Sequence, residues 1–224
     1  MAAFCLRNEA RQQSLFWTTD TELEHSFPPF LLVNSHNFPS NCRNFVTVEA
    51  EENLQEYIIT EVKGDKLKIY TEDGVSLKTS RNKDIIITVP FKDLEAVNLA
   101  GSGDVTSKDV INAQDFKCSV SGSGDMILEV NAQDVTASVA GSGDLSIGGS
   151  TQKSHLKVAG SGDLHASDLK SNDAEASIAG SGDISLNCNG GTLKAAVAGS
   201  GDIVYTGKPD KVDSKVVGSG SVSN

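Results

Sequence analysis

Residues 156–164 read Leu-Lys-Val-Ala-Gly-Ser-Gly-Asp-Leu, and close variants of this segment recur along the second half of the chain. The tetrapeptide Gly-Ser-Gly-Asp occurs six times, and a seventh copy beginning at Gly218 ends in Ser221 instead of aspartate. Successive copies start 21, 19, 19, 20, 19 and 19 residues apart. A fixed period of about twenty residues predicts a fold of stacked repeats.

Each motif follows a segment in which apolar and polar residues alternate. Val158 and Leu156 lie two and four residues before Gly160, with Lys157 between them, and Leu164 and Ala166 follow Asp163 with the same alternation. A period of two predicts short strands with one buried face on both sides of the motif. The residues two before the motif are therefore expected to form one internal row: Val120, Val139, Val158, Ile178 and Val197.

Equivalent strands occur once per repeat, so stacking pairs each strand in parallel with its copy in the next turn. The pattern predicts an all-β fold, a single-stranded parallel β-helix with about 19–21 residues per coil and roughly eight to ten coils. A leucine-rich horseshoe would need its Leu and Asn signature, and a propeller would need a longer period.

The motif is expected to form the corner between the two strands of a coil. Glycine reaches positive φ easily, so the two glycines of each motif, such as Gly160 and Gly162, are expected to have positive φ. Ser and Asp side chains can accept hydrogen bonds from nearby backbone N–H groups. The expected ladder of turn residues is Gly101, Asp104, Gly122, Asp125, Gly141, Asp144, Gly160, Asp163, Gly180, Asp183, Gly199 and Asp202.

Stacked aspartates would repeat about every 5 Å, where like charges repel by about 1 kcal/mol per pair in water. Two interpretations compensate this repulsion. The carboxylates cap backbone amides of the same turn, or they bind cations between the layers. Calcium takes six to eight oxygens, which one carboxylate per layer does not readily supply. We therefore expect capping, no metal and no cofactor.

Two regions are expected, residues 1–44 and residues 45–224. The second region is the β-helix, and its strand-like segments between residues 45 and 89 are expected to form irregular first coils. Residues 1–44 contain Trp17 and three of the five prolines and show no repeat. They are a cap over the solenoid, a poorly ordered tail, or sequence from a wrongly assigned start.

Composition excludes several classes of partner. A formal net charge of −11 and a pI near 4.7 disfavour nucleic acid and anionic membranes. No stretch is apolar and long enough to predict a membrane span, and Arg7, Glu9 and Arg11 interrupt the apolar start too early for a signal peptide. The cysteines Cys5, Cys42, Cys118 and Cys188 show no metal-type spacing and are expected to be free thiols, with Cys118 packed inside.

The Gly-Ser-Gly-Asp motif does not indicate an enzyme active site. A dinucleotide site would need a third glycine and a following helix. An active site would break the repeat with converging carboxylates and a basic residue. His155 and His165, the only histidines in the coils, fall at different positions of the repeat.

Residues 46–54 read Val-Thr-Val-Glu-Ala-Glu-Glu-Asn-Leu, and Thr60-Glu61-Val62, Leu67-Lys68-Ile69-Tyr70-Thr71 and the serial Gly-Ser-Gly-Asp turns follow. This arrangement resembles the putative auto-transporter adhesin family with the head GIN domain, over about residues 45–224. The resemblance implies an exported, right-handed parallel β-helix with no assigned biochemical role. In that family a further strand pair and an export signal usually precede the segment that starts at Phe45, and this chain departs from that pattern.

The resulting expectation is a non-catalytic structural or adhesion-type module at the cell surface or in secreted form, which binds a glycan or a protein. The alternative is a carbohydrate-active enzyme of the polysaccharide lyase or hydrolase type. A cluster of carboxylates outside the repeat register would favour the enzyme, and its absence would favour the scaffold.

Overall fold

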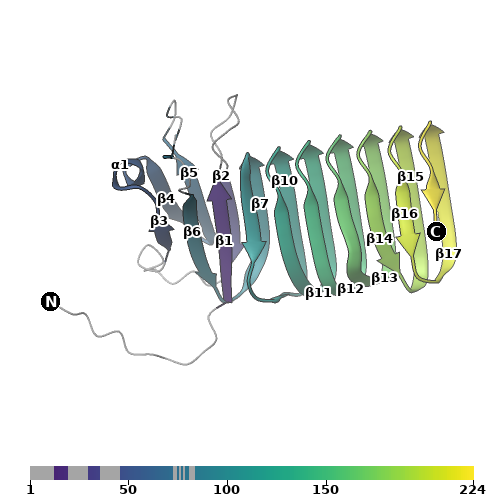
Figure 1. Ribbon diagram of the computed structural model, residues 1–224. Helices are drawn as coiled ribbons and strands as arrows, with labels where there is room; N and C mark the ends of the chain where they lie inside the picture. Colours follow the sequence, from purple (N-terminus) through teal and green to yellow (C-terminus); the bar gives the residue numbers. More distant parts are fainter. Residues whose placement is uncertain are drawn as a thin grey trace.

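The computed structural model describes residues 13–19, 30–35, 46–72, 75, 77, 79–80 and 84–224. Its elements are nearly all strands, and they form one row of rungs that runs from the N-terminal strands to β17 (Figure 1). No helix among these residues is long and apolar enough to cross a membrane.

The repeats form a parallel β-solenoid of about seven turns, in which each strand pairs in parallel with its equivalent in the next coil. Gly122, for example, lies opposite Gly141, and Gly141 lies opposite Gly160. The solenoid strands are β7 (Leu94–Gly101), β8 (Gly103–Ser107), β9 (Ile111–Asn112), β10 (Asp115–Gly122), β11 (Met126–Gly141), β12 (Leu145–Gly160), β13 (Leu164–Gly180), β14 (Ile184–Cys188), β15 (Gly190–Gly199), β16 (Ile203–Thr206), β17 (Pro209–Gly218) and β18 (Val222–Ser223).

The predicted internal row is confirmed. Val120, Val139, Val158, Ile178 and Val197 lie opposite one another in successive coils, and each is at most 2% exposed. Branched apolar side chains stacked in this way fill a narrow interior with few aromatic residues. Phe116 is the largest fully buried side chain of the core.

The two glycines of the motif are required for different reasons. Gly160 has a φ of +141°, as expected, but Gly162 has no positive φ. A Cβ on Gly162 would instead lie 2.1 Å from the carbonyl oxygen of Gly143 in the preceding coil. The second glycine is therefore fixed by the close approach of two backbones, and the expectation of a positive φ at that position is wrong.

The first strands do not form parallel coils. β4 (Ile58–Lys63) and β5 (Lys66–Thr71) make an antiparallel hairpin around the two-residue turn Gly64-Asp65, in which Gly64 has a φ of +61°. β3 (Thr47–Glu49) pairs antiparallel with β6 (Ile85–Phe91), and the short helix α1 (Glu52–Gln55) follows β3. The interpretation of residues 45–89 as irregular first coils is therefore wrong, which explains why fewer than eight coils are formed.

Residues 1–44 contribute two strands to this end of the solenoid. β1 (Gln13–Thr19) pairs antiparallel with β6 and β8, and β2 (Phe30–Ser35) pairs antiparallel with β5 and β7. Leu31 and Val33 of β2 are fully buried in the core. Both strands thus pair with strands at the start of the solenoid, and the rest of residues 1–44 lies outside the described residues.

Replacing Val158 with Asp places an unpaired charge in the internal row and should lower the free energy of unfolding by at least about 3 kcal/mol. Lys157, which is exposed on the same strand, supplies the matched control Lys157→Asp, with an expected change below about 0.5 kcal/mol. Urea unfolding measures both variants. Equal stability of Val158→Asp and the parent protein would contradict the register.

Replacing Gly162 with Ala forces a methyl group into the backbone of the preceding coil and should lower stability by at least about 2 kcal/mol. Gly64→Ala is the control, because Gly64 has a positive φ but no atom within 4 Å of the added Cβ. That variant should lose only about 1 kcal/mol, the strain of a left-handed alanine. Equal losses in thermal or urea unfolding would mean that close stacking does not fix Gly162.

Candidate functional site

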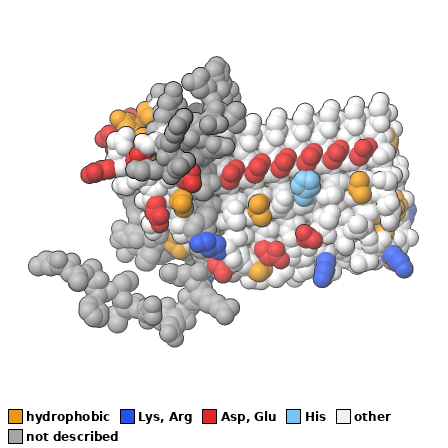
Figure 2. Space-filling view, viewed as in Figure 1, with side chains coloured by type: hydrophobic (Ala, Val, Ile, Leu, Met, Phe, Trp, Pro, Cys, Tyr) orange, Lys and Arg blue, Asp and Glu red, His pale blue; other side chains and the backbone are white. Residues whose placement is uncertain are grey.

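The six aspartates of the motif form one continuous ladder along the outside of the solenoid, visible as a diagonal row in Figure 2. Each carboxylate accepts a hydrogen bond from the backbone N–H of the residue at the same position in the next coil. Asp144 Oδ1, for example, lies 2.9 Å from the amide nitrogen of Asp163. The other bonds of the ladder measure 2.7–3.1 Å, and the last joins Ser221 N to Asp202 Oδ1 at 2.7 Å.

The backbone around the motif explains why an aspartate is needed. The carbonyl oxygen of Gly141 already accepts two hydrogen bonds from the next coil, from Ser161 N at 2.9 Å and Gly162 N at 3.0 Å. The third N–H of that corner, on Asp163, therefore needs another acceptor, and the Asp144 carboxylate supplies it. A carboxylate that accepts a backbone N–H is stabilised in its ionised form, which offsets repulsion along the ladder.

The N–H group that each carboxylate caps lies in the following coil. The expectation that it would be an N–H group of the same turn is therefore wrong. The structure brings all the predicted turn residues together in one ladder, from Gly101 and Asp104 to Gly199 and Asp202. Asp173 follows the same rule outside the motif. Its Oδ1 accepts the N–H of Thr192 at 2.8 Å, and this bond holds the pKa of Asp173 below its ordinary value.

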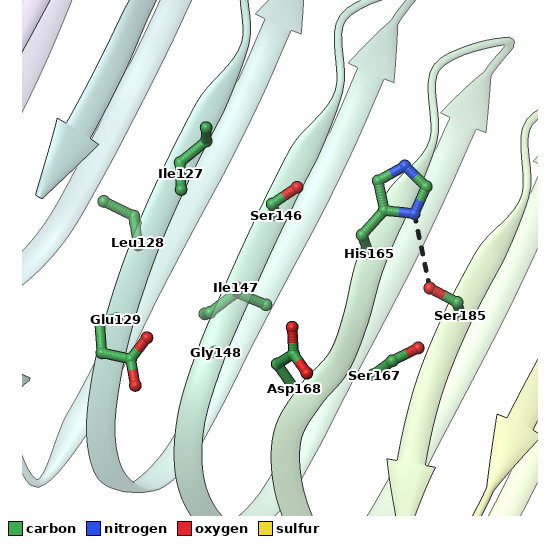
Figure 3. Close-up of a pocket in the computed structure, with 10 residues that line it drawn as sticks. All are labelled: Ile127, Leu128, Glu129, Ser146, Ile147, Gly148, His165, Ser167, Asp168 and Ser185. Carbon is green, nitrogen blue, oxygen red and sulfur yellow. Dashed lines mark hydrogen bonds between the residues drawn. The ribbon is translucent and has the colours of Figure 1, made fainter.

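Beside the ladder, a second row of side chains lines an open hollow of about 340 Å³ (Figure 3). Each member lies two residues after a motif aspartate: Ile127, Ser146, His165 and Ser185. Ile127 is 56% exposed, which is unusual for an isoleucine on this solenoid. Ser185 Oγ lies 3.5 Å from Nδ1 of His165. The row therefore combines an apolar surface with hydroxyl and imidazole groups.

Two carboxylates outside the aspartate ladder complete the hollow, at Glu129 and Asp168. Gly148 lies opposite Glu129 in the next coil, and a Cβ on Gly148 would lie 2.8 Å from Glu129 Oε2 and 3.6 Å from Asp168 Cβ. The missing side chain of Gly148 therefore leaves the space between them. Asp168 lies in a bulge, because the pairing register shifts after Ser146 on one side and after Ala166 on the other.

Neither carboxylate is buried, and neither Lys nor Arg lines the hollow. Its residues can accept and donate hydrogen bonds, but they offer no buried general acid and no activated nucleophile. His155 lies elsewhere, with Nδ1 3.5 Å from Glu175 Oε2, so the two histidines do not form one site. Among the residues that the structure describes, no group of three or more His, Cys, Asp or Glu side chains could hold a metal ion.

The described cysteines are buried free thiols, as expected for Cys118. Burial raises the pKa of Cys118 to about 12. Burial, and next the negative charge of Asp173, also raises the pKa of Cys188, against a lowering hydrogen bond from the backbone of Ala174. Neither thiol is therefore a thiolate near neutral pH, and neither is a candidate nucleophile. Cys5 and Cys42 lie outside the described residues.

The sequence identified the ladder and missed the hollow. Of the lining residues, only His165 is a candidate functional residue from the sequence, and neither Glu129 nor Asp168 belongs to a motif. Two signals were available in the sequence: an isoleucine at a position where most other copies carry Ser, Thr or His, and the one extra residue in the repeat between Gly160 and Gly180.

Comparison with known families gives a match over residues 38–209 to the family described as putative auto-transporter adhesin, head GIN domain. This range covers most of the solenoid and part of its N-terminal strands. No curated protein shows significant sequence similarity to the chain.

Several solved structures share the fold. A putative adhesin from Bacteroides fragilis has 26% sequence identity and a TM-score of 0.72, covering 80% of this chain and 81% of its own. A putative lipid binding protein from Parabacteroides distasonis has 29% identity and a TM-score of 0.65, with coverage of 80% and 82%. A putative adhesin from the same species has 26% identity and a TM-score of 0.64, with the same coverage.

The ladder predicts a stability that does not depend on calcium. Thermal unfolding with millimolar calcium and with a chelator should give superimposable curves, because every carboxylate from Asp125 to Asp202 is already bonded to a backbone amide. A rise in melting temperature with calcium that is lost in Asp144→Asn would instead favour a cation ladder.

The same ladder predicts that Asp144→Ala lowers stability by about 1–2 kcal/mol, because the N–H of Asp163 loses its acceptor. Asp144→Asn keeps an acceptor oxygen and should lose less. Asp115→Ala, at an exposed carboxylate outside the ladder, should change the free energy of unfolding by less than about 0.5 kcal/mol.

Proposed function

Because the chain belongs to the family described as putative auto-transporter adhesin, head GIN domain, we propose that it is an exported, non-catalytic adhesion module. The binding surface in this proposal is the face that carries the aspartate ladder and the adjacent hollow. The solenoid supplies a rigid support, since each coil is bonded to its neighbours through both strands and corners. Family membership and the adhesin-like structural neighbours support the general role. The hollow supports the particular ligand argued below.

The observation that carries the choice of ligand is the gap over Gly148, which leaves the carboxylates of Glu129 and Asp168 on the rim of one hollow. Carboxylate oxygens accept strong hydrogen bonds from hydroxyl groups. Ile127 offers an apolar surface on which the C–H face of a sugar ring can pack, and Ser146 and Ser185 add hydroxyl groups. This combination fits a glycan, for which a few convergent polar groups define orientation.

Charge narrows the class of glycan. The ladder sets a row of carboxylates beside the hollow, and the chain carries a net charge of −11. The resulting negative potential repels sulfated sugars and uronic acids. We therefore propose a neutral glycan as the ligand. An acyl chain would need a more apolar lining than one exposed isoleucine, so the lipid-binding description of one structural neighbour is not carried over to this chain.

The second candidate function is a carbohydrate-active enzyme, which is favoured by the same pair of carboxylates because neither residue recurs at its position in the neighbouring coils. Against it, both groups are exposed, whereas a general acid is normally kept protonated near neutral pH by burial. No Lys or Arg lines the hollow to stabilise a developing negative charge. We therefore place binding above catalysis.

Calorimetric titration of the intact protein with neutral oligosaccharides, uronic acid oligomers and sulfated oligomers tests the proposal. We expect binding of a neutral oligosaccharide only, weakened at least about fivefold in Glu129→Gln and in Asp168→Asn, which corresponds to losing one good hydrogen bond. Gly148→Ala should also weaken binding while the fold is retained, because the added methyl group meets only the far end of the Glu129 side chain and the β-carbon of Asp168.

Asp115→Asn is the matched control, since it removes an exposed charge outside the hollow and should leave the affinity unchanged. Tighter binding of an anionic glycan, or an affinity indifferent to all three changes in the hollow, would overturn the choice of site. Product oligosaccharides of lower mass, lost in Asp168→Asn, would favour the enzyme.

A further inference from the structure

Exposed apolar residues are concentrated at one end of the solenoid. Of the five large hydrophobic side chains that are exposed among the described residues, Val204, Val212, Val216 and Val217 lie on β16 and β17, and only Ile127 lies elsewhere. Val212 and Val216 are 42% and 41% exposed, whereas their equivalents Leu193 and Val197 in the preceding coil are 0% and 1% exposed. The rows of internal apolar side chains therefore continue into β17, but no further strand of the described residues packs over Val212 and Val216.

The backbone of β17 is also unpaired along one side. Within the described residues β17 pairs with β15 alone, and its residues 210–218 are all exposed. This strand lies at the end of the array opposite the N-terminal strands (Figure 1). A long edge strand with exposed apolar side chains is a template for pairing with another strand.

The aspartate ladder does not continue beyond this coil. Ser221 stands where aspartate is expected, and both its N–H and its hydroxyl donate to Asp202 Oδ1, at 2.7 and 2.8 Å. Between earlier coils, from Asp104 onward, each aspartate carboxylate accepts a hydrogen bond from the corner amide of the next coil. Ser221 has no carboxylate with which to accept that bond from a further parallel coil. The edge is therefore better suited to an antiparallel partner than to another parallel coil.

We propose that two copies of this protein associate through β17, with the two β17 strands antiparallel and Ser214 of each copy opposite the partner's Ser214. In this register Val212 lies opposite the partner's Val216, and Asp213 lies opposite the partner's Lys215. The two-fold symmetry repeats both pairs. Residues opposite each other across two strands share a face, so the valines extend the core and the charges pair outside it.

Neighbouring registers are less favourable. A two-fold axis at Asp213 sets Asp213 opposite itself and Lys211 opposite the partner's Lys215, and an axis at Lys215 sets Lys215 opposite itself. An axis at Val212 retains opposite charges but places Val216 against the partner's Lys208. A register shifted by one residue would place the valines of one copy on the same face as the charged residues of the other, so the valines would be exposed to solvent. Of these registers, only the one centred on Ser214 pairs both the valines and the opposite charges.

The other end of the solenoid favours a closed dimer over a chain of copies. There β1 and β2 pair antiparallel with the first strands of the solenoid and occupy their edges. The two ends are therefore not complementary, and head-to-tail stacking has no matching surface. A contact in which both copies use the same surface closes as a dimer.

Sedimentation analysis of the full chain tests the interface. We expect a reversible dimer of twice the 23.5 kDa chain mass, with no larger species. Asp213→Lys sets a lysine against the partner's Lys215, and Lys215→Asp sets an aspartate against the partner's Asp213, so each variant alone should raise the dissociation constant at least about tenfold. Because both residues are exposed, the monomers should keep the parent circular dichroism spectrum.

Mixing the two variants is the decisive measurement. One copy then carries two lysines and the other two aspartates at these positions, so the mixture should form a heterodimer with an affinity near that of the parent. Asp115→Lys is the control, because Asp115 is exposed on β10 and strands β11, β12, β13 and β15 separate it from β17; it should leave dimerisation unchanged. A protein that stays monomeric at about 100 µM, a series of species beyond the dimer, or a mixture that fails to associate would each overturn the proposal.

Discussion

The close stacking of glycine upon glycine at the corner is the constraint on which the rest of the structure depends. The carbonyl oxygen of Gly141 accepts hydrogen bonds from both Ser161 and Gly162 of the next coil, and a Cβ at either glycine of that corner would lie within 2.3 Å of backbone oxygen. This contact fixes the distance and the register between coils. The internal valine row follows from the same register, and so does the need for a carboxylate to satisfy the remaining corner amide.

How far the sequence predicts the structure depends on whether a feature is repeated. The parallel solenoid, the row containing Val158 and the ladder containing Asp163 are each shared by successive coils, so a single alignment of the repeats reveals them. An alignment of the repeats does not show which atoms of the neighbouring coil each residue contacts. The aspartates were expected to cap amides of their own turn, and Gly162 was expected to need a positive φ, because both inferences considered one coil alone.

The hollow is made of departures from the repeat. Gly148 removes a side chain from one coil, the extra residue near Asp168 bulges the next, and Ile127 stands in the coil before them at a position that is serine in the following coil. None of these changes is informative alone, because their effect depends on residues about twenty positions apart lying side by side. The regular coils form the rigid solenoid, and these local irregularities place apolar and carboxylate side chains together in one hollow on its surface.

The polarity of the stack explains why its two ends differ. At each corner the N–H groups of Ser, Gly and Asp donate toward the preceding coil, and the Gly carbonyl and the Asp carboxylate accept from the following one. The first corner has no preceding coil, and there β1 pairs antiparallel with β8, so that Thr18 lies opposite Asp104. At the last corner within the described residues, Ser221 stands in place of the aspartate, so this corner presents no carboxylate acceptor. An antiparallel strand thus replaces the missing parallel neighbour at the first end. A second β17 would solve the same problem at the other end, because an antiparallel pair does not need the donor and acceptor pattern of the corner.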